Sequence, residues 1–398
     1  MRDGGHALRR IVLSGSLCAA AACARRAQVV PEPTPARLSE ATRFLDSAVA
    51  DGAAPGAVLA VSAGGRRFFH ATGRLGADDA TAPDSSTVYD LASLTKVIGL
   101  TTAVMLAVDE GRLELGAPVD RYVPAFTGDR KGGVTLRHLL THSSGLPAWR
   151  ALHKESADRA GAMALADTTP LDSAPGAHMV YSDLGAIVLT QAVERAFGSR
   201  LDALLDARVF APLGMTSTRF LPPAEWLPRI APTELDPWRG RVLRGEVHDE
   251  NASRLEGVSG HAGLFSSAAD LLRFGEWLLS GVGHLPRDSA APPPPRSLGR
   301  FVRRQRMPAG SSRALGWDTP SQGSSAGRLM SATSFGHTGF TGTSIWIDPT
   351  RDLVVVLLSN RVHPTRENQQ WGPVRRNVAD RVVRGLYGDP TAPERRSE

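Results

Sequence analysis

The chain has 398 residues, of which 42% are apolar and 22% carry a formal charge. This composition is typical of a globular protein with a sizeable core and excludes a disordered or fibrous chain. The formal net charge of +6 falls to +4 without residues 1–24, which hold three Arg and one Asp, and the basic residues form no stripe with interleaved aromatic residues. Nucleic acid is therefore not an expected partner.

Residues 1–24 are predicted to be a secretory signal peptide. Arg2, Arg9 and Arg10 form a basic start, and residues 11–22 form a short apolar stretch. This pattern is typical of an export signal and is too short for a membrane span. Two processing routes are open: cleavage next to small residues, or attachment of a lipid to Cys23. The expected location is periplasmic, lipid-anchored or extracellular, and the alternative is an uncleaved disordered tail.

Two residue types are scarce. Cys18 and Cys23, both within the signal, are the only cysteines, and Lys96, Lys131 and Lys154 are the only lysines. A processed protein would then have no disulfide, no thiolate metal site and no cysteine nucleophile. A lysine at a chemically informative position stands out in such a chain, because a buried lysine can lose its proton whereas arginine cannot.

The rest of the chain is divided by composition. Residues 25–37 are Pro-rich and are predicted to be a tether, 38–388 to be one domain, and 389–398 to be a disordered tail. Within the domain, β-rich segments lie at both ends and helical patterns in the middle. The predicted fold is α/β: an antiparallel sheet lobe (38–116 and 256–388) flanked by helices, with an inserted helical lobe (117–255).

The elements are assigned from apolar periodicity, caps and turn residues. In chain order we predict a helix over 38–49, a hairpin over 57–71, a buried apolar helix from Ser93 to about Glu110, helices over 135–141, 183–197, 201–209 and 267–279, a low-complexity loop over 281–297, strands over 344–347 and 353–359, and a helix over 373–386.

The sequence Ser93-Leu94-Thr95-Lys96 is the first candidate for chemistry. A serine hydroxyl is a poor nucleophile until a neighbouring group takes its proton. Positions i and i+3 share one face of a helix, so Lys96 can reach Ser93. The N-terminus of the helix also favours developing negative charge. The alternative is a helix cap followed by a surface lysine, but this helix offers little polar surface.

Two further short sequences are weak evidence when taken alone. Tyr181-Ser182-Asp183 precedes a predicted helix, and a tyrosine close to a cation can shuttle protons. His337-Thr338-Gly339 precedes the strand pair, where a glycine lets a substrate lie along a strand edge. The alternatives are a half-buried core tyrosine and an ordinary loop histidine.

In combination, Ser-x-x-Lys, Tyr-x-Asp and His-Thr-Gly resemble the serine β-lactamase and penicillin-binding-protein-like group. The group includes class C β-lactamases, D-alanyl-D-alanine carboxypeptidases and related esterases. The resemblance covers roughly residues 40–385. It extends to the sequences of residues 134–147, 212–215 and 260–265. It implies a β-lactamase/transpeptidase-like fold with the site between the sheet and the helical lobe.

The resemblance also implies roles. Ser93 would be the nucleophile that forms an acyl-enzyme, and Lys96 and Tyr181 would share the proton transfers in an order that stays open. The backbone N–H groups of Ser93 and Phe340 would form the oxyanion hole. The substrate would lie against the remaining motif residues, Asp183, His337, Thr338 and Gly339.

Two residues depart from the class C pattern. Asp183 stands where those enzymes mostly have asparagine, so it cannot donate a hydrogen bond to an acylamino group, and it is a candidate partner that raises the pKa of Lys96. His337 stands where lysine is usual and would be a weaker carboxylate anchor. Both favour a carboxypeptidase or a small-ester or amide hydrolase. The alternatives are an inactive penicillin-binding sensor of cell-wall fragments and a weak class C-type β-lactamase.

No cofactor and no metal is expected. Residues 245–250 (GEVHDE) place His, Asp and Glu together, but no second ligand set has matching spacing. We interpret this segment as a loop beside the cleft, and His142 and His261 as structural residues. The expected partner is a small-molecule or peptide substrate with a scissile ester or amide bond.

Overall fold

The sheet lobe is built from both ends of the chain. A computed structural model describes residues 30–76 and 78–389, so the predicted signal, Cys23 and nearly all of the predicted tail lie outside it. One five-stranded antiparallel sheet has the order β2-β1-β10-β9-β8. Its strands are β1 Gly56–Ala63, β2 Arg66–Gly73, β8 Phe335–Thr338, β9 Ser344–Asp348 and β10 Leu353–Ser359.

The remaining elements are short strands and helices. A three-stranded sheet has the order β3-β7-β4, and β5 pairs with β6. These strands are β3 Val88–Asp90, β4 Arg219–Phe220, β5 Leu235–Asp236, β6 Arg241–Val242 and β7 Leu264–Ser267. The helices are α1 Pro35–Ala50, α2 Thr102–Asp109, α3 Leu136–Leu140, α4 Leu152–Glu155, α5 Arg159–Thr168, α6 Asp183–Phe197, α7 Leu201–Leu205, α8 Glu250–Arg254, α9 Ala268–Val282, α10 Leu298–Phe301 and α11 Trp371–Tyr387.

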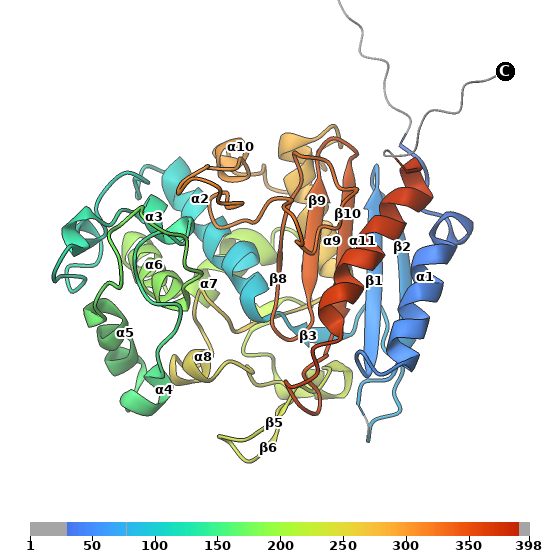
Figure 1. Cartoon of the computed structure of the whole chain (residues 1–398), viewed down its shortest axis with the longest axis horizontal. Coiled ribbons are helices and arrows are strands. Elements are labelled where there is room, and N and C mark those ends of the chain that lie inside the picture. Colours follow the sequence, from blue (N-terminus) through green and yellow to red (C-terminus); the bar gives the residue numbers. More distant parts are fainter. Residues whose placement is uncertain (1–29, 77, 390–398) are drawn as a thin grey trace, which may run out of the picture.

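The central strands are buried on both faces, which explains their continuous apolar sequences. Alternate residues of β10 point to different cores: Val355 packs with α1 and α11, whereas Val354 and Val356 pack with α9. Figure 1 shows α1 and α11 on one face of the sheet and α9 on the other. The sheet is therefore the middle layer of a sandwich with helices outside.

The helical lobe lies beside the sheet, and an apolar stretch of helix passes between them (Figure 1). Residues 92–109 are long and apolar enough to cross a membrane by length and composition, but 78% of this stretch is buried in the fold. It contacts α6 and α7 of the helical lobe and belongs to the larger apolar core. We interpret it as a core helix that carries the site.

The structure corrects three of the predicted elements. The tether over 25–37 is wrong at its end, because α1 begins at Pro35 and Thr34 caps it. The helix expected from Ser93 is a 3-10 turn at Ala92–Leu94, a π-helical segment at Lys96–Thr101, and then α2. His337 does not precede the strand pair but lies within a strand, β8, which the short sequence FGHT does not reveal.

The packing of α11 on α1 yields a stability prediction. A Cβ added at Gly385 would lie 2.1 Å from the backbone oxygen of Arg37, whereas one at Gly372, near the start of the same helix, would meet nothing within 4 Å. Because a backbone atom cannot move aside cheaply, Gly385→Ala is expected to lower the free energy of unfolding by about 1–3 kcal/mol. Gly372→Ala should leave it unchanged or slightly raise it. Urea unfolding of both variants checks this, and equal effects would contradict the packing argument.

Candidate active site

Ser93 lies on a strained turn that follows β3. Ala92 has a φ of 46°, which is uncommon for a residue with a side chain and costs about 1–3 kcal/mol. The turn is held by Asp90, whose Oδ1 accepts the Ala92 N–H at 2.8 Å. Ser93 follows directly in the 3-10 turn and lines a cavity between the lobes. The strained turn therefore presents the hydroxyl at the start of the buried helix.

Lys96 is buried and has three polar partners. Its Nζ donates to Ser93 Oγ at 3.0 Å and to the carbonyl of His261 at 3.0 Å, and it lies 2.6 Å from Asp183 Oδ1. The same ammonium lies 4.9 Å from the centre of the Tyr181 ring. The structure thus brings together Ser93, Lys96, Tyr181 and Asp183, which are separated by up to 90 positions in the sequence.

The charge of Lys96 is decided by two opposed effects. Burial is the largest and acts to lower the pKa of Lys96, because it penalises the ammonium form. The negative charge of Asp183, together with Tyr181, acts in the other direction and outweighs burial, so the pKa of Lys96 is raised. The sequence left both a deprotonated and a paired lysine open, and the structure favours the paired, protonated one.

Tyr181 is partly buried, and its hydroxyl is buried beside Lys96. Among the described residues its Oη has no partner in good hydrogen-bond geometry, but it lies close enough to Lys96 to help raise the pKa of that lysine. The ring lies 4.4 Å from that of His142, whose Nδ1 accepts the Ser182 N–H at 3.1 Å. His142, predicted to be structural, therefore packs against Tyr181 and holds the residue that follows it. An unpaired hydroxyl at such a place suits a bond to substrate.

His337 is a neutral histidine in contact with an arginine. Its Nδ1 donates to the Thr338 carbonyl at 2.8 Å, which leaves Nε2 to accept from Arg313 Nη1 at 3.2 Å. Burial, the charge of Arg313 and that of Lys96 hold the pKa of His337 well below its ordinary value. The Arg313 guanidinium also lies 5.1 Å from the Tyr181 ring. The cation that contacts His337 and Tyr181 is thus Arg313, which lines the same cavity as Ser93 and which sequence reasoning missed.

The turn after β8 fits closely against the serine turn. A Cβ added at Gly339 would lie 2.2 Å from the Leu91 oxygen, so only glycine fits there. Thr343 Oγ1 donates to that same oxygen at 3.0 Å. Phe340 follows Gly339, and its N–H has no hydrogen-bond partner among the described residues. Phe340 and Ser93 line the same cavity, and a free backbone donor in such a place is what an oxyanion hole requires.

The cavity at the site has a volume of about 610 Å³ and a cationic wall. Ser93, Tyr181 and residues 337–340 line it together with four arginines and a single acid: Arg313, Arg361, Arg375, Arg376 and Asp318. A larger cavity of about 1720 Å³ lies between residues 299–306 and 349–352 and holds none of the predicted site residues. The smaller cavity is therefore the candidate active site, and its charge suits an anionic substrate.

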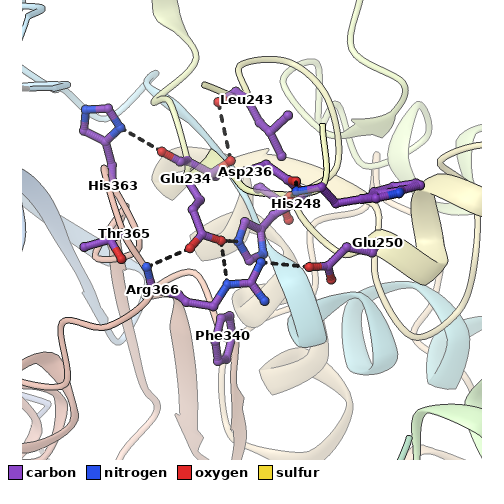
Figure 2. Close-up of polar contacts among 12 residues, drawn as sticks. Glu234, Asp236, Leu243, His248, Glu250, Phe340, His363, Thr365 and Arg366 are labelled. Atoms are coloured by element: carbon purple, nitrogen blue, oxygen red, sulfur yellow. Dashed lines mark hydrogen bonds and ion pairs between the residues drawn. The ribbon is translucent and has the colours of Figure 1, made fainter. Parts of the chain in front are cut away.

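The acidic and histidine-containing segment 245–250 borders this site without forming a ligand cluster. His248 Nε2 donates to Glu234 Oε2 at 2.9 Å, and Arg366 bridges Glu234 and Glu250 (Figure 2). Asp249 Oδ1 instead accepts from Nε2 of His261 at 2.8 Å. Within residues 30–76 and 78–389, no group of three or more His, Cys, Asp or Glu is arranged to hold a metal ion.

Comparison with known proteins identifies the family of the chain. A family model described as Beta-lactamase matches residues 41–380. The chain belongs to the β-lactamase family. This family match spans residues of both lobes. The resemblance drawn from the motifs is confirmed.

Similar proteins with a name or a solved structure agree with this family assignment. The chain is 32% identical over 319 residues to a protein from Salmonella schwarzengrund (strain CVM19633), provisionally named D-alanyl-D-alanine carboxypeptidase, with 73% of each chain covered. A penicillin-binding protein homologue from Caulobacter crescentus has a TM-score of 0.71 at 19% identity, with 88% of this chain and 98% of that chain covered. A β-lactamase from Sulfitobacter sp. EE-36 has a TM-score of 0.70 at 22% identity, with 88% and 97% covered.

A third structure, EstCE1, described as a hydrolase with promiscuous acyltransferase activity, has a TM-score of 0.69 at 21% identity, with 87% of this chain and 98% of that chain covered. The structural likenesses confirm the predicted fold class. The family match and the named relatives identify this protein as a serine hydrolase.

The Lys96–Asp183 pair yields a pH prediction. A raised lysine pKa stabilises the fold below the unfolded-state pKa of about 10.4, and this stabilisation is lost as the pH rises through the folded-state pKa. Asp183→Asn removes the charge that opposes burial, so it is expected to lower the free energy of unfolding at pH 7 by roughly 3 kcal/mol. The loss should shrink towards pH 10, as Lys96 of the variant gives up its proton.

Urea unfolding at both pH values measures this change. Asp129→Asn is the control, because Asp129 pairs with Arg130 at an exposed position, where such pairs contribute at most about 1 kcal/mol. A loss in Asp183→Asn that is the same at pH 7 and pH 10 would show that Asp183 does not set the charge of Lys96.

Proposed function

We propose that this protein is an exported serine acyl-hydrolase that forms an acyl-enzyme on Ser93. In acylation, Ser93 Oγ bonds to the substrate carbonyl carbon, the bond to the leaving amine or alcohol breaks, and the hydroxyl proton ends on that leaving group. In deacylation, water adds to the same carbon, the acid is released and the hydroxyl is restored. The observation that carries the proposal is the 3.0 Å bond between Ser93 and buried Lys96.

The proton transfers are assigned to Lys96 and Tyr181. An ammonium that donates to Ser93 Oγ stabilises the alkoxide as the proton leaves. The buried Tyr181 Oη, which lies beside the Lys96 ammonium, would pass a proton between Ser93 and the leaving group. The backbone N–H groups of Ser93 and Phe340 would hold the oxygen that becomes negative in the transition state, and such a donor contributes about 3 kcal/mol.

The proposed substrate is a carboxylate-bearing peptide of the D-alanyl-D-alanine type or a small ester or amide. The cationic wall suits a free carboxylate, and the named relative supports a carboxypeptidase. Asp183 is held by Lys96 and cannot donate to an acylamino group as an amide does. This supports a peptidase or esterase over an efficient β-lactamase. Ser93, Thr338 and Gly339 would line the scissile bond, with His337 orienting Arg313 rather than carrying charge itself.

The proposed cellular location rests on the predicted signal peptide. The basic, apolar and small-residue pattern of residues 1–24 supports export, and Cys23 is the proposed lipid-attachment site if the chain is anchored to a membrane. Mass spectrometry of the mature protein from cells distinguishes a lipid on Cys23 from simple cleavage.

Active-site labelling tests the acyl-enzyme. We expect a fluorescent penicillin or a fluorophosphonate to modify Ser93, located by mass spectrometry of the folded protein. Ser93→Ala should abolish labelling and reduce turnover of p-nitrophenyl esters to the background rate. If turnover in Ser93→Ala equals that of the wild type, the hydrolytic assignment is wrong; if the wild type is labelled but does not turn over, the protein is a penicillin-binding sensor instead.

Arg313 is expected to anchor the substrate carboxylate. A hydrogen bond between charged groups contributes about 1.5–3 kcal/mol, so Arg313→Gln should raise KM for carboxylate-bearing peptides by about 10-fold or more. The kcat/KM for neutral p-nitrophenyl esters in the same variant is the control and should change little. A similar loss for both substrate types would show that Arg313 supports Tyr181 and His337 rather than binding the carboxylate.

A further inference from the structure

The two proposed oxyanion donors come from segments that are far apart in the sequence. One follows β3 and holds Ser93, and the other follows β8 and holds Phe340. Donors of this kind must lie within about 0.5 Å of their working positions to stabilise a transition state. Some part of the protein must therefore fix the spacing between the two segments.

Asp90 joins three segments at this place. It is buried, with 2% of its surface exposed. Its Oδ1 accepts the Ala92 N–H at 2.8 Å, its Oδ2 accepts the His248 N–H at 2.7 Å, and its backbone carbonyl accepts from Thr341 Oγ1 at 2.7 Å. One residue thus holds the strained serine turn, the loop over 245–250 and the turn that carries Phe340.

His248 connects the same loop to Phe340. Its ring stacks on the Phe340 ring, with centroids 5.8 Å apart and 25° between the planes. Glu234 fixes that ring through Nε2 and itself accepts from the backbone N–H and the Nε of Arg366 at 3.0 and 2.6 Å. Figure 2 shows Phe340 beside this group of Glu234, His248 and Arg366.

Phe340 depends on these contacts because burial alone does not hold it. Its relative exposure is 47%, so the ring lies largely at the surface. Besides His248, Arg361 contacts it: the Arg361 Nε donates to the Phe340 carbonyl at 2.8 Å, and the guanidinium lies 4.5 Å from the ring. The N–H on the other side of the residue remains free for a ligand.

We infer that Asp90 and His248 are positioning residues that together fix the two oxyanion donors relative to each other. Asp90 accepts the Ala92 N–H and so holds the turn on which Ser93 lies. It also accepts the backbone N–H of His248, and the His248 ring stacks on Phe340. His248 thus links the position of the serine turn to that of Phe340. The inference rests on the proposed function, since it assigns these residues to the oxyanion hole of that reaction.

A matched control variant distinguishes the positioning role of Asp90 from a purely structural role. Asp270 is another buried carboxylate, and its Oδ2 accepts the Ser217 N–H at 2.7 Å and the Thr218 hydroxyl at 2.8 Å. It bonds to those residues rather than to either oxyanion segment. Asp90→Asn and Asp270→Asn should therefore cost comparable stability, measured as the melting temperature, but only the former should change catalysis.

The test is steady-state hydrolysis of p-nitrophenyl acetate together with binding of phenylboronic acid, which forms a tetrahedral adduct on an active-site serine. We expect Asp90→Asn to lower kcat by about 10-fold or more with KM within about twofold of the wild type, and to weaken boronate binding by a similar factor. Asp270→Asn should leave both unchanged at a temperature where it is folded.

Variants at His248 keep the inference testable if Asp90→Asn does not fold. His248→Ala removes the ring and should lower kcat severalfold, whereas His248→Phe restores a stacking ring and should recover most of that loss. If kcat and boronate affinity in Asp90→Asn match those of Asp270→Asn, or if His248→Ala and His248→Phe behave alike, the inference is overturned. Lack of label on Ser93 in the wild type would instead overturn the proposed function.

Discussion

The buried pairing of Lys96 with Asp183 is the interaction on which the site depends. A charged group removed from water must be paired, because the cost of leaving it unpaired is several kcal/mol. Lys96 belongs to the central stretch of helix, and Asp183 is the first residue of α6 in the helical lobe. The N-terminus of α6 also favours a carboxylate there. The pairing therefore links the two segments that carry the catalytic groups.

The same pairing determines which proton steps are open. As long as Asp183 keeps its charge, Lys96 remains an ammonium, and its effect on Ser93 is that of a fixed positive charge and donor. The second proton carrier must then be a neighbouring group, and Tyr181, whose hydroxyl is buried beside Lys96, is the candidate. An asparagine at position 183 would leave burial as the main effect on the pKa of Lys96. Residue 183 therefore decides whether Lys96 is an ammonium or a neutral amine that can accept a proton.

Much of this arrangement could be predicted from the sequence because short, local sequence patterns indicate it. Ser93 and Lys96 are three residues apart, and the apolar runs of β1 and β10 mark buried strands. Three features had no local signal. The π-helical segment over 96–101 arises where the buried helix packs between the lobes, β8 has only four residues and includes a glycine, and Arg313 lies in a loop among many other arginines. Their roles come from tertiary contacts, which a single sequence does not display.

The distribution of functional groups explains why lobe packing and activity should be inseparable in this fold. Ser93 and Lys96 come from the central helix, Tyr181 and Asp183 from the helical lobe, and Phe340 from the edge of the sheet. The sheet lobe holds the nucleophile, Lys96 and both backbone donors, but Tyr181 and the carboxylate that pairs with Lys96 come from the helical lobe, so neither lobe contains the whole set. A loosening of the seam between the lobes would separate these groups by more than catalysis tolerates, well before either lobe lost its own core. The contacts that cross the seam, such as those of Asp90 and Lys96, therefore bear on rate as directly as on stability.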